Sequence, residues 1–347
     1  MKVMITGSTG FIGSALCRAL DNENKMDLTS AEPYTILAFH RPGTSMNVLS
    51  GVNATSVVGD LCDADSISRT IITYQPDMIF HLAAQTTAAG DGSRLLDVNV
   101  NGTRRLLQSA FQNHVKRVVV ISSACSLGIP EYPVSKKAAS MMMDESHCWN
   151  YAPEKWIYAW SKYLMEREVQ LACANGMDVV IVNPTWVIGP GDCYRKRSSF
   201  LVHLREHPVR YYLEGGINLI GIDDVIRGIR NAAAYGKKGE RYILGGTNIS
   251  FRDLITILSG INDSVVPVLS LPNLVAEASF RGKECLRNLV SIGEIENNIF
   301  RFPGRYFYYD TTKSRLNLHL PVPEKIENSI KAAYTWFYDK KSVVKEQ

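Results

Sequence analysis

Short apolar runs alternate with amphipathic stretches along most of this chain, and the alternation predicts strands separated by helices. The runs that read as strands or strand ends are Val3–Ile5, Tyr34–Phe39, Val57–Leu61, Met78–Ala84, Val118–Ser123 and Asp178–Pro184. Helices are expected over 14–20, 63–75, 95–114, 157–175 and 323–338, and the polar residues 21–33 read as a loop. Strands and helices in this order predict an α/β fold built on a doubly wound parallel sheet, with ligands at the carboxyl ends of the strands.

Three glycines spaced three residues apart join the first strand to the first helix. They are Gly7, Gly10 and Gly13, in the pattern G-x-x-G-x-x-G rather than G-x-G-x-x-G. A helix that starts after such a turn directs free backbone N–H groups and the positive end of its dipole at a phosphate. We expect Gly7 to permit the turn, Gly10 to let a pyrophosphate approach, and Gly13 to let the helix pack closely. The glycines alone would also suit an ordinary turn, but their place between strand and helix favours a nucleotide site.

In dinucleotide-binding folds, the residue at the end of the second strand distinguishes NAD from NADP. An acidic residue there binds the ribose 2′-hydroxyl of NAD, whereas an arginine suits the 2′-phosphate of NADP. No acidic residue lies between Tyr34 and Asn47, and Arg41 stands at this point. NADP(H) is therefore favoured, with NAD(H) as the alternative, and an arginine in a solvated loop is the other reading of Arg41.

Composition narrows the class of protein further. The 347 residues carry a formal net charge of only +4, which gives little support to a nucleic-acid or membrane partner. No apolar run approaches the roughly 18 residues of a membrane span. The seven cysteines are scattered without the spacing of metal ligands, so we expect no metal, reduced thiols and a cytoplasmic location.

The pattern Tyr-x-x-x-Lys occurs three times and carries the candidate chemistry. On a helix it places a phenol and an ammonium group one turn apart on the same face, so that the cation favours loss of the phenolic proton. Proline interrupts the pattern in Tyr132–Lys136 and Tyr151–Lys155. Tyr158 and Lys162 have no proline between them and continue into a good helix. We therefore expect this pair to transfer a proton during a hydride reaction.

Three motifs identify a family resemblance. Residues 6–13 (TGSTGFIG), 99–103 (NVNGT) and 183–192 (NPTWVIGPGD) closely resemble segments of the extended short-chain dehydrogenase/reductases, the NAD(P)-dependent epimerase/dehydratase family with its Rossmann fold. The resemblance implies Ser123, Tyr158 and Lys162 as catalytic residues, with Ser122 as runner-up to Ser123 and Ser126 as a substrate contact. It also implies a homodimer through helices 95–114 and 157–175. The implied cofactor contacts are Gly7, Thr9, Gly10, Phe11, Ile12, Gly13, Arg41, Asp60, Leu61, Leu82, Ala83, Ala84, Tyr158, Lys162, Pro184 and Val187.

The branch of the family is indicated by one missing arginine. Sugar-nucleotide epimerases carry an arginine that reaches the substrate diphosphate, and here that slot is Asn218–Ile220. The chain looks more like the dihydroflavonol reductase-like and 3β-hydroxysteroid dehydrogenase-like members, which act on apolar or aromatic small molecules. Sugar-nucleotide epimerisation or dehydration is the first alternative, and a non-catalytic NADP sensor or scaffold is the second. Met141–Met143, Trp149 and Trp186 could line an apolar pocket, although core packing is the favoured reading of each alone. Arg195–Arg197 could meet an acidic substrate, but a solvated charged loop is the favoured reading.

Two domains are expected. Residues 1–189 with about 215–246 would form the dinucleotide-binding domain, and about 190–214 with 247–347 a smaller substrate-binding domain. His81, at the end of a buried strand, is read as a structural residue.

Overall fold

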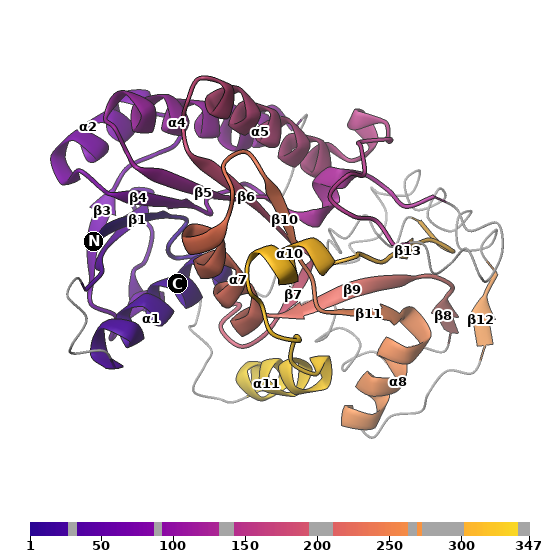
Figure 1. Ribbon diagram of the computed structural model, residues 1–347. Coiled ribbons are helices and arrows are strands. Elements are labelled where there is room, and N and C mark those ends of the chain that lie inside the picture. Colours follow the sequence, from indigo (N-terminus) through magenta and orange to yellow (C-terminus); the bar gives the residue numbers. More distant parts are fainter. Residues whose placement is uncertain are drawn as a thin grey trace.

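A computed structural model describes residues 1–26, 33–86, 92–131, 142–193, 211–262, 269–272 and 302–338. Its centre is a parallel sheet of seven strands in the order β10-β6-β5-β4-β1-β2-β3 (Figure 1). The strands are β1 Lys2–Thr6, β2 Thr35–His40, β3 Ala54–Val58, β4 Met78–His81, β5 Arg117–Ile121, β6 Val179–Pro184 and β10 Arg241–Leu244. The strand order reverses between β1 and β4, which confirms the predicted doubly wound α/β fold.

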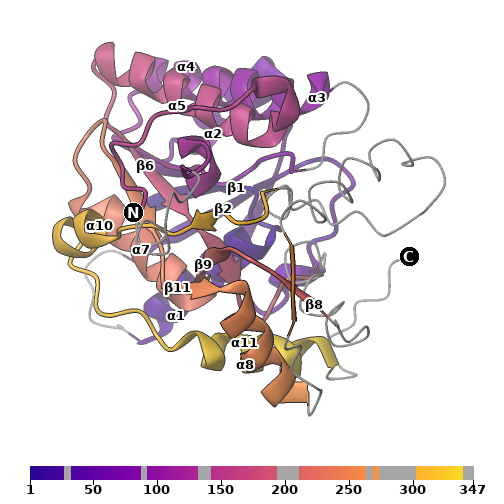
Figure 2. The same cartoon turned by 90° about the vertical axis from the view of Figure 1, so that its right-hand side faces the viewer.

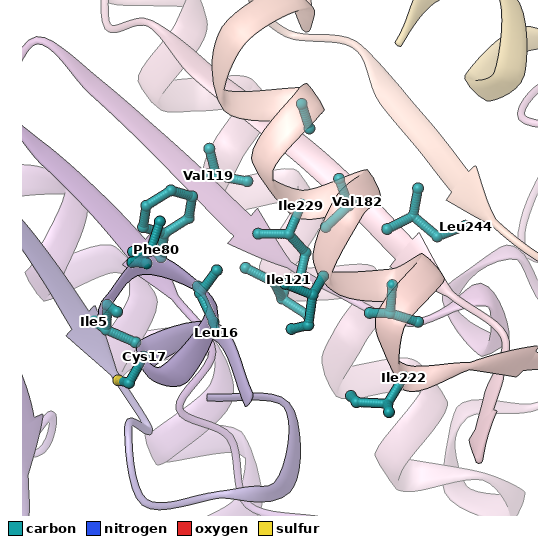
Figure 3. Packing of buried hydrophobic residues seen from close by; sticks show 14 of the residues in the cluster. Ile5, Leu16, Cys17, Phe80, Val119, Ile121, Val182, Ile222, Ile229 and Leu244 are labelled. Carbon is teal, nitrogen blue, oxygen red and sulfur yellow. The ribbon is translucent and has the colours of Figure 1, made fainter. Parts of the chain in front are cut away.

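Helices cover both faces of this sheet. On one face lie α1 (Phe11–Met26) and α7 (Ile222–Tyr235). On the other lie α2 (Ala64–Tyr74), α4 (Gly102–Gln112) and α5 (Ile157–Ala174), as Figure 1 shows. The buried side chains between the sheet and the first pair of helices appear in Figure 3, where strand residues meet α1 and α7; those labelled are Ile5, Leu16, Cys17, Phe80, Val119, Ile121, Val182, Ile222, Ile229 and Leu244.

A second, smaller sheet lies beside the carboxyl edge of the first. Strand β9 (Gly216–Gly221) is parallel to β7 (Trp186–Ile188) and β13 (Tyr306–Phe307) and antiparallel to β11 (Thr247–Ser250). Helices α8 (Phe251–Asn262) and α11 (Ile326–Tyr338) pack on it, and Figure 2 shows them on the side away from α2, α4 and α5. The short helix α10 (Thr312–Asn317) and the pair β8 (Tyr211–Leu213) with β12 (Leu269–Leu271) complete the described fold.

Three sequence expectations differ from these elements. The first helix does not end near residue 20, because α1 continues to Met26 and buries Asp21, which pairs with Lys25 one turn later. Strand β3 begins at Ala54, before the apolar run, because the exposed Thr55 and Ser56 still pair with β2. The helix expected over 95–114 is observed over 93–112, but it consists of α3 (Ser93–Leu96), a π-helical turn (Asp97–Asn101) and α4.

The expected division into two domains remains a prediction. It assigns residues 1–189 and about 215–246 to the nucleotide domain, and therefore includes β7 and β9 there. In the structure both strands pair within the second sheet, together with β11 and β13. A boundary drawn by hydrogen bonding would place these two strands with the smaller unit. Within the described residues, no helix has the length and apolar character needed to span a membrane.

Candidate active site

A cavity of about 470 Å³ opens at the carboxyl edge of the main sheet, where the strand order reverses. The segments that follow β1 to β6 all contribute to its wall, and β9 and β13 of the second sheet close the opposite side. Parallel strands bring their carboxyl ends to one edge, so residues far apart in sequence meet there. Of the residues expected at the site, the cavity is lined by Gly7, Thr9, Gly10, Phe11, Ile12, Gly13, Arg41, Asp60, Leu61, Leu82, Ala83, Ala84, Ser123, Tyr158, Lys162 and Pro184.

The glycine turn forms a cradle that side chains would fill. Gly7 has φ +69°, and a Cβ there would lie 2.7 Å from the Ala83 nitrogen. A Cβ on Gly13 would overlap the Gly7 carbonyl oxygen. The turn is closed by the Gly10 N–H, which donates to the Gly7 carbonyl at 3.0 Å, and α1 begins at Phe11. Backbone that approaches this closely at a helix N-terminus fits a dinucleotide pyrophosphate.

The exits of β2 and β3 form a further part of the cavity wall beside the glycine turn. Arg41 is exposed at the cavity wall, together with His40 and Thr44. The Asp60 carboxylate accepts the Cys62 N–H at 2.9 Å and so shapes the turn after β3. His40 and Thr44 were not among the expected residues. They carry no motif of their own, and only the position after an apolar strand could have indicated them.

Helix α5 carries Tyr158 and Lys162 one turn apart, and both line the cavity. The Lys162 ammonium is buried and donates to the Ile121 carbonyl at 3.1 Å, at the end of β5. Tyr151 and Lys155 do not share a helix face, because Pro153–Lys155 is a short 3-10 turn ahead of α5. Tyr132–Lys136 lies outside the described residues.

The three serines after β5 have different surroundings. Ser123 lines the cavity, and its hydroxyl accepts the Cys125 N–H at 3.4 Å. Ser122 also reaches the wall, but its hydroxyl donates to the Glu166 carboxylate at 2.5 Å. Ser126 is fully buried and donates to the same carboxylate, so its side chain does not line the cavity in which a substrate contact was expected.

The π-helical turn positions the exit of β4. Its Asn99 is buried, accepts the Gln85 N–H at 2.7 Å and donates to the Gln85 carbonyl at 2.9 Å. The same amide donates to the Ser161 hydroxyl at 2.9 Å, next to Lys162 in sequence. A single side chain therefore ties the loop after β4 to helix α5. π-Helical turns often occur at functional sites, and this one places Asn99 in the core behind Gln85, which lines the cavity.

His81 is a structural residue, as expected. The Thr103 hydroxyl donates its hydrogen to the Asn99 carbonyl, so it accepts from His81 Nε2 at 2.8 Å. The other ring nitrogen, Nδ1, lies 2.8 Å from the Thr6 hydroxyl and acts as its acceptor. Burial lowers the pKa of His81 to about 3, and the charge of Lys162 contributes in the same direction. The ring is therefore neutral at physiological pH.

The wall opposite the glycine turn is largely apolar. Trp156, Phe307 and Tyr309 line it from a cluster in which Trp156 and Phe307 meet edge to face, with ring centroids 6.2 Å apart. Burial raises the pKa of Tyr309 above its ordinary value, and its hydroxyl lies 3.4 Å from the Ala124 carbonyl. Trp186, expected here, does line the cavity, whereas Trp149 does not and Met143 is in the core. Met141 and Arg195–Arg197 lie outside the described residues.

Two expectations about neighbouring strands have different outcomes. Val187 is fully buried in β7 against the core, and its side chain does not reach the cavity, contrary to the expected cofactor contact. Asn218, in the slot where an arginine was sought, lies on β9 and does line it. Its carbonyl oxygen accepts from the Thr185 hydroxyl at 2.7 Å and the Gly246 N–H at 3.0 Å, and its amide nitrogen donates to Asn248 at 2.7 Å.

Comparisons with known proteins agree with this architecture. Residues 3–245 match the model of the NAD dependent epimerase/dehydratase family. A Synechocystis protein whose name assigns it provisionally to dihydroflavonol 4-reductase is 30% identical over 96% of this chain and 93% of its own. Sterol demethylase protein B of Methylococcus capsulatus is 27% identical over 98% and 99%. The crystal structure of gox2253 has a TM-score of 0.80 at 25% identity, covering 98% of both chains. Matches also include the dTDP-glucose 4,6-dehydratase of Salmonella typhimurium, at 25% identity over 77% and 78%.

The fold and the cavity define an NAD(P)-binding enzyme of the extended short-chain dehydrogenase/reductase type. The chain belongs to the NAD dependent epimerase/dehydratase family, whose members include reductases, dehydratases and epimerases acting on small molecules. Among the described residues, no group of histidine, cysteine, aspartate or glutamate side chains could hold a metal ion.

Proposed function

We propose that this protein is an NADP(H)-dependent oxidoreductase that interconverts a carbonyl and a secondary alcohol on a small, largely apolar or aromatic substrate. The observation that carries the proposal is the shared cavity, which is lined by the glycine turn, by Ser123, Tyr158 and Lys162, and by an aromatic wall. The free cysteines among the described residues are in keeping with a reducing compartment, and we propose the cytoplasm.

Three side chains would carry the protein's part of the chemistry. The nicotinamide ring, when bound, supplies or accepts the hydride. In the reductive direction the Ser123 hydroxyl donates a hydrogen bond to the substrate carbonyl oxygen, and the Tyr158 phenol delivers a proton to it. Lys162 stabilises the tyrosinate that remains and holds the nicotinamide ribose. Its burial strengthens this effect, because fewer water molecules screen the charge.

The walls of the cavity support an apolar substrate over a sugar diphosphate. A diphosphate calls for a guanidinium group or several free donors. Asn218, in the slot where an arginine was sought, is a neutral amide, and one of its two N–H bonds already donates to Asn248, so it offers a phosphate neither a charge nor a fork of donors. The rings of Trp156, Phe307 and Tyr309 instead offer flat apolar surfaces. The names of the Synechocystis and Methylococcus relatives also refer to flavonoid and sterol chemistry.

Arg41 supports NADP over NAD. It is exposed at the end of β2, beside the adenosine end of the cradle, where a guanidinium group can pair with a 2′-phosphate. Hydrogen bonds to charged groups contribute about 1.5–3 kcal/mol. Replacing Arg41 by Ala should therefore weaken NADPH binding by about 10- to 100-fold and leave NADH binding unchanged. Titration of both nucleotides by fluorescence measures this difference, and an equal loss for both would contradict the assignment.

A substrate screen tests the reaction itself. The purified protein is incubated with NADPH and a panel of aliphatic ketones, flavonoid-like and steroid-like carbonyls, and dTDP- and UDP-sugars, and NADPH oxidation and products are measured together. The proposal expects NADPH consumed in equal amount to alcohol formed from an apolar carbonyl. Conversion of a nucleotide sugar without net NADPH consumption would instead identify an epimerase or dehydratase. NADPH binding without turnover of any compound would favour a sensor or scaffold.

A further inference from the structure

A buried carboxylate lies directly behind the loop that carries Ser123. Glu166 is on α5, one turn after Lys162, and is 4% exposed. Its Oε1 atom accepts from the Ser122 hydroxyl at 2.5 Å, the Ser126 hydroxyl at 2.6 Å and the Asn183 amide at 2.6 Å. Its Oε2 atom accepts from Arg241 Nη1 at 3.2 Å. Both carboxylate oxygens of Glu166 therefore act as hydrogen-bond acceptors inside the protein.

These partners surround Ser123 without touching its hydroxyl. Ser122 precedes it, and the Ser126 hydroxyl lies 2.8 Å from the Ser123 carbonyl. The Asn183 amide donates to that same carbonyl at 3.2 Å. Lys162 donates to the carbonyl of Ile121, the residue before Ser122. Helix α5 therefore holds the segment 121–126 through two of its residues, Lys162 and Glu166. The Asn183 side chain connects the Glu166 carboxylate to the Ser123 carbonyl.

A contribution to folding stability does not by itself explain why Glu166 is buried here. Burying an ion pair such as Glu166 with Arg241 costs desolvation that its attraction repays only with good geometry, and an apolar replacement is often neutral. The four donors to the Glu166 carboxylate instead fix one arrangement of the residues that carry them. In this protein the network fixes the orientation of Ser123, which lines the cavity and lies between Ser122 and Ser126 in the chain.

We propose that Glu166 is a positioning residue that sets the Ser123 hydroxyl against the reacting oxygen, acting through Ser122, Ser126 and Asn183. The inference rests on the proposed function, because it assumes that Ser123 polarises the substrate carbonyl. Glu166 has no contact with the substrate in this scheme. Its sequence signal is only its place four residues after Lys162.

A double-mutant cycle tests the proposal. Glu166→Gln should lower kcat by about 10- to 100-fold, the range found when outer partners of a functional ligand are removed. The NADPH Kd should stay unchanged, because the glycine turn is untouched. In a Ser123→Ala background the same substitution should change kcat by less than about threefold, since its effect passes through a hydroxyl that is already gone. An equal loss in both backgrounds would overturn the proposal.

The matched control is Glu168→Gln, the same chemical change on the same helix at a residue paired with Arg104 outside the site. It should leave kcat and the Ser123→Ala cycle unaffected. If Glu166→Gln does not fold, Ser122→Ala and Ser126→Ala each remove one donor to the carboxylate and should show the same dependence on Ser123.

Amide hydrogen exchange gives a readout that does not need turnover. In the NADPH-bound protein, exchange over residues 121–129 should rise in Glu166→Gln and not in Glu168→Gln. Unchanged exchange there would overturn the positioning role even if the wild-type chain were inactive. If the wild type shows no turnover but exchange over 121–129 still rises in Glu166→Gln and not in Glu168→Gln, the result counts only against the proposed function.

Discussion

At the scale of single residues, the site depends on which polar groups are already committed to the protein and which face the cavity. Ser122 and Ser126 give their hydroxyl hydrogens to Glu166 or its neighbours, whereas Ser123 lies on the cavity wall between them. The family resemblance implies Ser123, and the hydrogen bonds favour it for an independent physical reason. Glu166 itself could not be identified beforehand, because its four partners come from three separate segments: the stretch after β5, strand β6 and strand β10.

Replacing Tyr158 by Phe removes one oxygen atom and nothing else. We expect kcat to fall by at least about 100-fold, since proton transfer by a positioned side chain contributes 10²- to 10⁴-fold. The NADPH Kd should change little, because the ring still packs against the cluster that contains Trp156 and Phe307. Single-turnover kinetics with the carbonyl identified in the screen measures the first quantity and fluorescence titration the second. Near-normal turnover would rule out Tyr158 as the proton donor.

The neutral His81 makes stability depend on pH. In the unfolded chain its pKa is near the ordinary 6.5, whereas in the fold it is about 3, so the unfolded state binds the extra proton first. This contribution to stability is present above pH 6.5 and is lost as the pH falls towards 3. Between pH 7.5 and 5.5 the wild type should lose about 1.4 kcal/mol more unfolding free energy than His81→Gln.

Denaturant unfolding at several pH values measures this difference. His114→Asn is the control, because His114 is exposed with φ 57°, a conformation that asparagine tolerates. Its pH dependence should follow that of the wild type. Parallel curves for wild type and His81→Gln would contradict the buried, neutral histidine.

At the scale of elements, the first strand, turn and helix could be predicted almost completely, whereas helix ends could not. The glycine spacing, the apolar run and the helical periodicity are all local signals. The end of α1 is decided by contacts, because Asp21 is buried and paired with Lys25 although its sequence neighbourhood is polar. The π-helical turn at Asp97–Asn101 has no local signal either, and follows from Asn99 reaching Gln85 and Ser161.

Gly13→Ala tests the close packing of this turn. The added Cβ would overlap the Gly7 carbonyl oxygen, so α1 must move away from β1. We expect a loss of about 1–3 kcal/mol in unfolding free energy, as for other overpacked sites, with greatly weakened NADPH binding. Gly260→Ala is the control: it lies exposed in α8 with no atom within 4 Å of the new Cβ. It should gain about 0.5–1 kcal/mol and bind NADPH normally. Equal effects of the two substitutions would contradict this packing.

At the scale of the whole molecule, the candidate active site lies between the main sheet and the second sheet. The remaining question at this scale is whether two chains associate. We propose that the chain forms a homodimer through α4 and α5, where Phe111 and Leu171 are 50% and 59% exposed. Apolar side chains of this size on neighbouring helices of one face favour an interface over solvent. Figure 1 shows these helices on the outer layer of the main sheet, away from α8 and α11.

Sedimentation velocity at micromolar concentration should give a dimer for the wild type and a monomer for Leu171→Lys, because a charge at an apolar interface is costly. Leu316→Lys on α10 is the control, since this leucine is also exposed but lies away from α4 and α5. It should remain dimeric. A monomeric wild type would contradict the proposed interface.

The sequence by itself determined the parallel α/β fold, the glycine cradle and the Tyr158–Lys162 pair, because each depends on residues within about one helical turn or one strand–turn–helix unit. Only the tertiary structure decided that Val187 lies in the core, that Ser126 donates to Glu166, that Asn218 is hydrogen-bonded to Thr185, Gly246 and Asn248, and that β9 joins the second sheet. These outcomes depend on which distant groups compete for each hydrogen bond and each buried position. A periodic pattern carries no information about such partners, because they are brought together only when the strands align.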